Sequence, residues 1–298
     1  MYARLALLLL AALAATLLPL FGCTMMPGPS ASKERVRAMG RADHLVDVRP
    51  AGAGEADQRE VSAIWSDADP TSDVLVIYVH GTPGDAESWA DYLDDPVGGA
   101  RAVAVDRPGF GKSDSRSLAD LRGQSRALAP FVQSAESVVL VGHSYGGPVV
   151  LQAALDFPDR VRGVVVIAGS VSPELEKRRW FNYLAQGVRL IVPRKLRRAN
   201  DEVWVLKPDL ERMAADLGRI EVPVAIVHGT EDGLVPYGNV AFMEGALTGA
   251  ERVDVTTLEG VGHFLIWEQE SIPKVRAAIE GVVRAAERPS DAASASTE

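Results

Sequence analysis

The segment that most constrains the fold of this chain is a six-residue glycine-rich turn, GHSYGG, at Gly142 to Gly147. Four apolar residues, Val138 to Val141, come directly before it, and an apolar stretch, Val149 to Phe157, follows. A strand that runs into a helix through Gly-x-Ser-x-Gly forms a nucleophile elbow, which holds the serine in a strained backbone conformation with its hydroxyl exposed. A side chain on either outer glycine would crowd such a turn. The segment therefore predicts a reactive serine, Ser144, at the edge of a sheet.

The rest of the chain alternates between segments typical of strands and of helices. We expect strands at His44 to Val48, Glu60 to Trp65, Val74 to Val79, Ala102 to Val105, Val138 to Val141, Gly163 to Ile167, Val224 to Val227 and Arg252 to Thr257. The third to the seventh are mainly apolar, like buried parallel strands, whereas the first two and the last contain polar residues, like strands at sheet edges. We expect helices at Glu87 to Leu93, Leu118 to Gln133, Tyr145 to Phe157, Tyr237 to Leu247 and Leu265 to Ala286. This alternation predicts an α/β fold with an eight-stranded, mostly parallel, doubly wound sheet.

One long segment interrupts the alternation. About 50 residues separate the sixth expected strand from the seventh, too many for a single crossover helix. Apolar residues recur there at near-helical spacing: Trp180, Leu184, Val188 and Ile191. Pro193 would end the helix that they form. We therefore expect residues 172–216 to form a short helical cap over the carboxyl edge of the sheet, and we assign Trp180, Tyr183 and Leu184 to substrate binding in an apolar acyl pocket.

The cap is basic although the whole chain, with a formal net charge of −9, is acidic. Between Pro173 and Lys207, nine Lys or Arg residues stand against four acidic residues, a balance of +5. A solvated helix face explains this balance, and the alternative is a basic, aromatic-bearing surface that meets lipid headgroups or an anionic substrate. The negative charge of the whole chain argues against nucleic acid as a partner.

The amino-terminal residues resemble an export signal. A run of 17 mainly apolar residues, Leu5 to Phe21, follows Arg4 and is shorter than the roughly 20 residues of a membrane span. It ends at Leu20-Phe21-Gly22-Cys23, which resembles the lipobox of bacterial lipoproteins. This resemblance implies cleavage before Cys23, lipidation of Cys23 and a location in the bacterial cell envelope, lipid-anchored on the periplasmic or extracellular side. An uncleaved anchor and a plain secretory signal are the alternatives.

These features divide the chain into four expected parts. Residues 1–22 are the expected lipoprotein signal peptide, 23–42 a tether, 43–287 one α/β domain that includes the cap, and 288–298 a disordered tail. Cys23 is the single cysteine, so no disulfide can form within the chain. No two histidines have the spacing of metal ligands. We therefore expect no metal and no other cofactor.

A serine hydroxyl needs a base and a third group that orients the base. His263, in Gly260-Val261-Gly262-His263, follows the last expected strand, and Asp232 follows the seventh, with Glu231 as the rival acid. Sites in open α/β sheets form at the carboxyl ends of the strands, where all these residues fall. The chain order Ser144, Asp232, His263 is that of α/β-hydrolases and differs from the orders in chymotrypsin and subtilisin. We assign these three residues as nucleophile, acid and base.

A glycine-rich loop after the third expected strand, His80 to Gly84, provides a candidate oxyanion hole. The backbone N–H of Thr82 and that of Tyr145, directly after the serine, are placed to converge on a developing oxyanion. Pro83 lacks an N–H and cannot contribute.

Four motifs resemble those of the α/β-hydrolase family and occur in its order: His-Gly-x-Pro-Gly at 80–84, Asp-Arg-Pro-Gly-Phe-Gly-x-Ser at 106–113, Gly-His-Ser-x-Gly-Gly at 142–147 and Gly-x-Gly-His at 260–263. The resemblance covers about residues 43–287 and implies the α/β-hydrolase fold. Serine stands where haloalkane dehalogenases and soluble epoxide hydrolases carry aspartate, which disfavours those activities. We expect Asp106 and Arg107 to fix a turn near the pocket, and His80, His143 and His228 to make structural hydrogen bonds.

The resemblance implies a serine hydrolase acting on a small-molecule acyl substrate, with carboxylic-ester hydrolysis as the expected reaction. The loop at 80–84 also resembles that of proline iminopeptidases, and related serine enzymes cleave C–C bonds or transfer acyl groups. A binding protein that keeps the fold without catalysis is the alternative outside enzymes.

Overall fold

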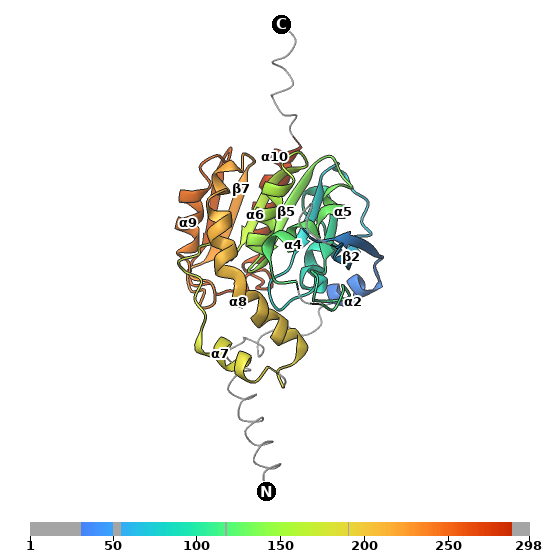
Figure 1. Ribbon diagram of the computed structural model, residues 1–298. Coiled ribbons are helices and arrows are strands. Elements are labelled where there is room, and N and C mark those ends of the chain that lie inside the picture. The colour runs from blue at the N-terminus through green and yellow to red at the C-terminus, as the bar shows by residue number, and fades with distance from the viewer. Residues whose placement is uncertain (1–30, 50–54, 117, 190, 288–298) are drawn as a thin grey trace.

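The computed structural model describes residues 31–49, 55–116, 118–189 and 191–287. These residues form one eight-stranded sheet with helices on both faces and a small cap at one end (Figure 1). The expected signal peptide, Cys23 and the expected tail lie outside the described residues, so these expectations stay predictions. Within the described ranges, no helix combines the length and the apolar character needed to cross a bilayer.

The strands lie side by side in the order β1-β2-β4-β3-β5-β6-β7-β8. Their bounds are β1 (Arg41–Asp47), β2 (Gln58–Trp65), β3 (Leu75–Val79), β4 (Arg101–Val105), β5 (Val138–His143), β6 (Val161–Ile167), β7 (Val224–Gly229) and β8 (Val253–Leu258). β1 and β2 are antiparallel, as are β2 and β4, whereas all other neighbours are parallel. The eight expected strands and the mostly parallel sheet are thus confirmed.

The expectation that the polar strands lie at sheet edges holds for β1 and β8 but is wrong for β2, which lies between β1 and β4. Gln58 to Ile64 of β2 pair with β1, whereas only Ala63 to Trp65 pair with β4. The polar residues of β2, such as Glu60, therefore fall in the half of the strand that has a single neighbour.

Two layers of helices cover the sheet. The helices are α2 (Ala31–Ala38), α3 (Ala90–Asp94), α4 (Leu121–Arg126), α5 (Ala129–Val132), α6 (Gly146–Asp156), α7 (Trp180–Gly187), α8 (Arg194–Ala214), α9 (Asn239–Ala246) and α10 (Ile272–Ala286). One buried cluster joins the sheet to α4, α5, α6, α9 and the second half of α8, and another joins it to α2, α3 and α10. Helices on both faces are the mark of a doubly wound sheet.

The expected helices at 118–133 and 265–286 also differ from the prediction, and both differences involve proline. The expected helix at 118–133 is divided into α4 and α5, and Pro130 lies in the first turn of α5. The expected helix at 265–286 begins only at Ile272, with Pro273 in its first turn. Proline has no backbone N–H to donate, so it suits the start of a helix better than its interior.

Helix α2 lies within the stretch expected to be a tether, so that expectation is wrong from Ala31 onward. Val36 is buried against the second cluster, and Arg35 and Arg37 form ion pairs with Asp94 and Glu87. The helix is therefore part of the folded domain.

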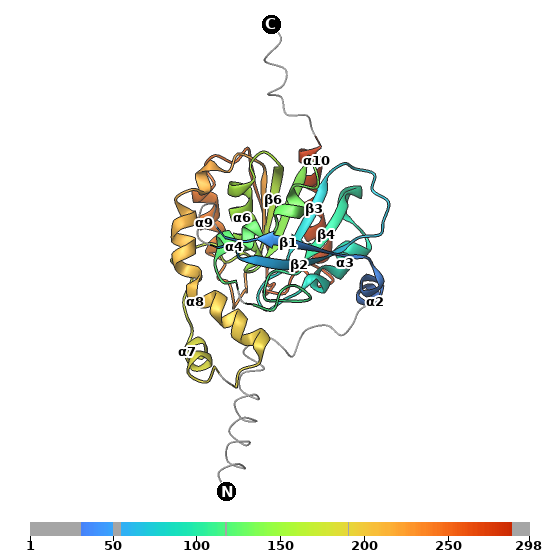
Figure 2. The ribbon, with the colours of Figure 1, turned by 45° about the vertical axis from the view of Figure 1, so that its right-hand side comes forward.

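The cap consists of α7 and the first half of α8 and lies beyond the sheet in both views (Figures 1 and 2). The expected helix ends at Gly187, four residues before Ile191. The 21-residue helix α8 was not foreseen as one element. Its first half belongs to the cap, whereas Leu206, Leu210 and Met213 in its second half are buried against the sheet. The cap is therefore continuous with the helical layer that covers the sheet.

Candidate active site

Ser144 lies in the tight turn between β5 and α6, with a backbone φ of +57°. The glycines on either side have no room for a side chain. A Cβ on Gly142 would lie 2.2 Å from the carbonyl oxygen of Gly146, and a Cβ on Gly146 would lie 2.3 Å from the carbonyl oxygen of Val79. The backbone N–H of Ser144 donates to the carbonyl of Ile167 at 2.9 Å and holds the turn against β6. The strained serine turn expected from the sequence is present.

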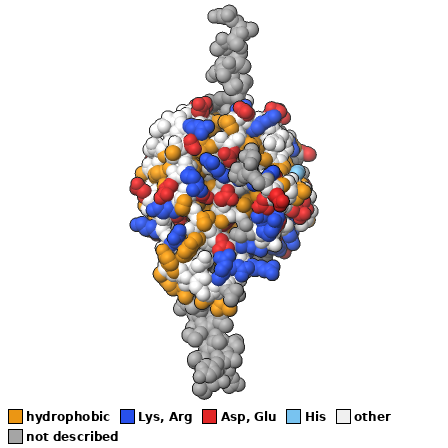
Figure 3. Space-filling model, viewed as in Figure 1, with side chains coloured by type: hydrophobic (Ala, Val, Ile, Leu, Met, Phe, Trp, Pro, Cys, Tyr) orange, Lys and Arg blue, Asp and Glu red, His pale blue; other side chains and the backbone are white. Residues whose placement is uncertain are grey.

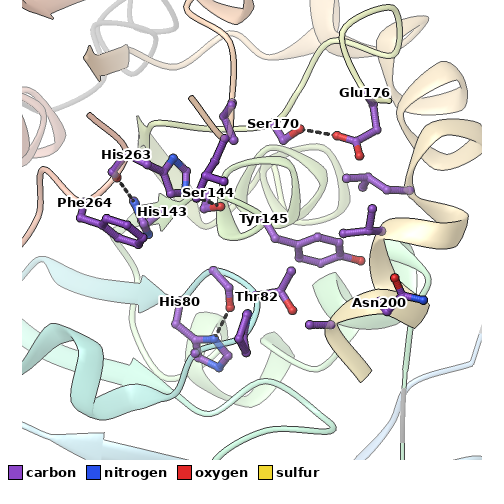
Figure 4. A pocket seen from close by; sticks show the side chains of 18 of the residues that line it. His80, Thr82, His143, Ser144, Tyr145, Ser170, Glu176, Asn200, His263 and Phe264 are labelled. Atoms are coloured by element: carbon purple, nitrogen blue, oxygen red, sulfur yellow. Dashed lines mark hydrogen bonds between the residues drawn. The ribbon is translucent and has the colours of Figure 1, made fainter. Parts of the chain in front are cut away.

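His263 and Asp232 come from loops after β8 and β7 and meet Ser144 at the carboxyl edge of the sheet (Figure 4 shows Ser144 and His263). The Nε2 atom of His263 lies 3.0 Å from Ser144 Oγ, and its Nδ1 atom lies 2.7 Å from Asp232 Oδ2. The other carboxylate oxygen of Asp232 accepts the N–H groups of Leu234 and Val235 at 2.8 and 2.7 Å. The three side chains therefore form a continuous hydrogen-bonded chain.

The geometry favours Asp232 over Glu231 as the acid that orients His263. The side chain of Glu231 is exposed, whereas that of Asp232 is buried against the imidazole of His263. Burial works to raise the pKa of Asp232, but the hydrogen bond and the charge interaction with His263 hold it below its usual value. The carboxylate is therefore ionised at neutral pH and faces the side of the imidazole away from the serine.

The three other histidines near the strand ends are held by structural hydrogen bonds, as expected. His143 Nε2 lies 3.0 Å from the carbonyl oxygen of His263, and His228 Nδ1 lies 3.1 Å from that of Gly229. His80 accepts the backbone N–H of Arg107 on Nε2 at 3.1 Å. Burial lowers the pKa values of His80 and His143 to about 3 and also lowers the pKa of His228. All three rings are therefore neutral at physiological pH.

The loop from His80 to Gly84 runs against the serine turn. A Cβ on Gly81 would lie 2.9 Å from Ser144 Cβ, so the loop passes directly beside the serine. The Thr82–Pro83 peptide bond is cis. Thr82 and Tyr145 both line the same cavity as Ser144 and His263 (Figure 4). The two residues assigned to the oxyanion hole are therefore brought together with the serine.

Arg107 anchors the loop from His80 to Gly84 through hydrogen bonds. Its guanidinium donates to the carbonyl oxygens of His80 and Gly81, both at 3.0 Å, and pairs with Glu202 of α8 at 2.5 Å. Arg107 and Glu202 are each only 1% exposed. Burial raises the pKa of Glu202, and the charge of Arg107 opposes that rise. The expected role of Arg107 in fixing a turn is present, with an unforeseen partner from the cap.

Asp106 completes the same turn. Its carboxylate accepts the backbone N–H groups of Ala86 and Lys112 at 2.6 and 2.9 Å and pairs with Arg41 at 2.8 Å. Sequence reasoning paired Asp106 with the turn but had no means to find Arg41, which comes from β1.

A cavity of about 420 Å³ lies between the serine and the cap. None of the three residues assigned to substrate binding lines it, so Trp180, Tyr183 and Leu184 are a wrong assignment. Helix α7 turns Asn182 inward, where its amide bonds Asn200 at 2.9 Å, and leaves Trp180 and Tyr183 60% and 55% exposed. The cap residues that line the cavity are instead Leu175, Glu176, Lys177, Arg179, Asn182, Leu196, Ala199, Asn200, Val203 and Leu206.

Among the described residues, Glu176 is the one acidic residue that lines this cavity. Glu176 accepts a hydrogen bond from the hydroxyl of Ser170 at 2.6 Å, and the N–H of Ser170 points to the carbonyl oxygen of Ser144 at 3.4 Å (Figure 4). Burial raises the pKa of Glu176. No sequence pattern distinguishes this residue beyond its place in the cap.

The model of the α/β hydrolase family matches residues 76–272, and the chain belongs to this family. A protein described as an aryl esterase from Burkholderia cenocepacia has a similar fold, with 21% identity, a TM-score of 0.60 and coverage of 83% of this chain and 100% of that one. A monoacylglycerol lipase from Paleococcus ferrophilus also has a similar fold, with 20% identity and a TM-score of 0.60. The likeness covers 75% of this chain and 98% of that one. A membrane phospholipase A has 22% identity and a TM-score of 0.58, with coverage of 94% of this chain and 98% of that one. These likenesses show the fold.

Two curated proteins are similar to part of the chain. The acetyltransferase component of the acetoin cleaving system of Cupriavidus necator is 36% identical over 99 residues, which are 31% of this chain and 26% of that protein. The chloroplastic protein PHYLLO of Arabidopsis thaliana is 29% identical over 139 residues, 43% of this chain and 7% of that protein. The matches thus span 26% and 7% of these relatives' lengths.

Proposed function

We propose that the protein is a serine hydrolase that cleaves carboxylic esters through an acyl-enzyme. The observation that carries the proposal is the hydrogen-bonded chain from Ser144 Oγ through His263 to Asp232, which starts at a serine with φ of +57°. A serine hydroxyl becomes a competent nucleophile when a neighbouring base accepts its proton, and the 3.0 Å contact supplies that base.

The reaction follows from these positions. Ser144 Oγ attacks the ester carbonyl carbon while its proton passes to His263 Nε2. The tetrahedral intermediate then expels the alcohol, which takes the proton from His263, and the acyl group remains on Ser144. Water attacks this acyl-enzyme, gives a proton to His263 and releases the acid, and the proton returns to Ser144. Asp232 fixes the imidazole tautomer and stabilises the imidazolium.

The oxyanion of both intermediates needs hydrogen-bond donors in place before the reaction. We assign this role to the backbone N–H groups of Thr82 and Tyr145. The position of both residues on the cavity wall with Ser144 supports the assignment, as does the anchoring of the Thr82 loop by Arg107.

A fluorophosphonate probe tests whether the chain is an enzyme. We expect one covalent adduct, mapped to Ser144 by mass spectrometry, and no adduct on the Ser144→Ala variant. A folded protein that leaves the probe unreacted would instead be the catalytically silent binding protein. A series of p-nitrophenyl esters of increasing acyl length then measures the ester preference.

A second candidate is an aminopeptidase of the proline iminopeptidase kind, which the carboxylate of Glu176 in the cavity favours. A carboxylate beside the nucleophile can bind the ammonium group of a peptide amino terminus. The two candidates are separated by comparing a butyrate ester with an N-terminal prolyl amide. If the amide is the better substrate and Glu176→Gln raises its KM alone, the protein is an aminopeptidase.

We also propose that the mature protein is lipid-anchored in the bacterial cell envelope through Cys23. The lipobox-like sequence before Cys23 supports this location. Several acyl chains hold a protein firmly on a membrane, so Cys23→Ala should move the protein from the membrane fraction to the soluble fraction. A Cys23→Ala variant that stays with the membranes contradicts the anchor.

A further inference from the structure

Most of the large apolar side chains exposed in the described part of the chain are at the cap. Six are more than a third exposed: Leu45, Trp180, Tyr183, Ile191, Val205 and Leu234. Trp180 and Tyr183 lie on α7, Ile191 lies between α7 and α8, and Val205 lies near the middle of α8. Leu234 lies against the cap, because Arg179 donates to the carbonyl oxygen of Leu234. Figure 3 shows hydrophobic side chains over the cap, with Lys and Arg side chains next to them. A gathered apolar surface of this kind marks an interaction site.

Cations accompany these apolar side chains. On α8, Arg194, Arg197 and Val205 are spaced at i, i+3 and i+11, so they share one side of the helix. We call Trp180, Tyr183, Ile191, Val205 and Leu234, together with Lys177, Arg178, Arg194 and Arg197, the cap face.

The cations of the cap face lack acidic partners. Two neighbouring cap cations are neutralised, since Arg189 pairs with Asp201 and Lys195 pairs with Asp85. No carboxylate of the described ranges lies within ion-pair distance of the four cap-face cations: Lys177, Arg178, Arg194 and Arg197. Arg178 lies instead over the ring of Trp204, 4.4 Å from its centroid. The cap face is therefore positive on a chain whose net charge is −9.

The cap face also borders the cavity. Lys177 and Leu234 are exposed and line the cavity that contains Ser144. Whatever covers the cap face therefore lies next to a wall of the cavity.

Tryptophan and tyrosine prefer the headgroup region of a bilayer, because each ring combines an apolar body with a polar group. Lysine and arginine near a bilayer are attracted to anionic headgroups. We propose that the cap face docks on an anionic lipid surface, with Trp180 and Tyr183 at headgroup depth and Arg194 and Arg197 against the headgroups. This docking is independent of the chemistry of Ser144 and of the proposed anchor at Cys23.

Tryptophan quenching in vesicles tests the proposal with the full chain. The Ser144→Ala protein is reconstituted into phosphatidylcholine vesicles with brominated acyl chains, with or without phosphatidylglycerol. We expect a quenching component that Trp180→Phe removes and that is stronger with phosphatidylglycerol. Arg194→Glu combined with Arg197→Glu should reduce that component at least about twofold.

A matched control changes the same charge elsewhere. Arg162, near the start of β6, and Arg284, near the end of α10, lie at the opposite edge of the sheet, and both are exposed. Reversal of both to Glu should leave the Trp180 component unchanged. Salt provides a second test without any charge variant: raising it to about 1 M should weaken the component, because the Debye length falls to about 3 Å.

Three results overturn the proposal. One is quenching that Trp180→Phe leaves unchanged in both kinds of vesicle. Another is a Trp180 component of equal size with and without the anionic lipid. The third is that charge reversal at Arg194 and Arg197 leaves the quenching intact but raises the KM of a soluble anionic ester without vesicles. This last result assigns the cations to an anionic substrate.

Discussion

The cavity has two walls that are built in different ways. On the sheet side, Ser144 and Asp232 follow strands that have neighbours on both sides, and His263 follows the edge strand β8. The side chains of all three are hydrogen-bonded to one another. On the cap side, α7 is a short helix with large apolar side chains in solvent, and it contacts mainly α8. The assigned catalytic side chains are therefore held by the sheet and by hydrogen bonds, whereas the cap side of the cavity is held mainly by the packing of α7 on α8.

The greatest loss of activity should follow a substitution on the sheet side. Asp232→Asn should lower kcat by about 10⁴-fold, because an amide that donates to His263 Nδ1 imposes the wrong tautomer. The exposed Glu231 provides the matched control, and Glu231→Gln should change kcat by less than about twofold. Steady-state kinetics on a soluble ester measure both. Equal losses in the two variants would remove Asp232 from its assigned role.

The next effect concerns the ion pair that joins the two walls. Glu202→Gln leaves the guanidinium of Arg107 buried without a countercharge, which should cost about 3–5 kcal/mol of unfolding free energy and lower kcat. Its neighbour Asp201 pairs with the partly exposed Arg189, so Asp201→Asn should cost about 1 kcal/mol or less. Urea unfolding of both variants measures the difference. If both variants lose the same unfolding free energy, the ion pair of Glu202 with Arg107 does not stabilise the fold more than a surface pair does.

A smaller effect is a pH dependence on the sheet side. Burial lowers the pKa of His143 to about 3, whereas the unfolded ring titrates near 6.5. Below pH 6.5 the unfolded state therefore binds a proton that the folded state does not, and the free energy of unfolding falls by about 1.4 kcal/mol per pH unit for this residue. His143→Gln should reduce the measured slope between pH 6 and 4.5 by that amount. An unchanged slope would mean that His143 is protonated in the folded state.

The smallest effect is expected on the outer side of the cap. Tyr183→Ser should change the unfolding free energy by less than about 0.5 kcal/mol and leave kcat/KM on a soluble ester unchanged, because Tyr183 does not line the cavity. Val203→Ser alters the cavity wall and should lower kcat/KM about tenfold on an apolar ester. The reverse ranking would restore Tyr183 to substrate binding.

The sheet side of the cavity was more predictable from the sequence than the cap side. Parallel strands buried on both faces must be apolar along their length, so the runs at Val138 and Val224 identify β5 and β7 without any tertiary information. The turn at Ser144 is equally local, because its glycines are required by atoms only a few residues away.

The cap was less predictable because local pattern does not say which face of a short helix is covered. Trp180 and Tyr183 are large and apolar, which suggested burial, yet they lie on the outer side of α7, and the polar Asn182 lies inside. Glu202 was counted as one acid among basic neighbours. Its partner Arg107 is 95 residues away in the chain, so only the folded structure brings the two together.

Helix α8 has a consequence for the engineering and divergence of this fold. At 1.5 Å per residue, its 21 residues are about 31 Å long, and this one helix, with Pro208 in its interior, extends from the cap into the layer against the sheet. A cap transplanted from a relative would therefore have to be joined within a helix, and it would have to supply its own carboxylate for Arg107. We therefore expect substrate preference to be easier to engineer by side-chain replacement along α7 and α8 than by exchange of the cap as a module.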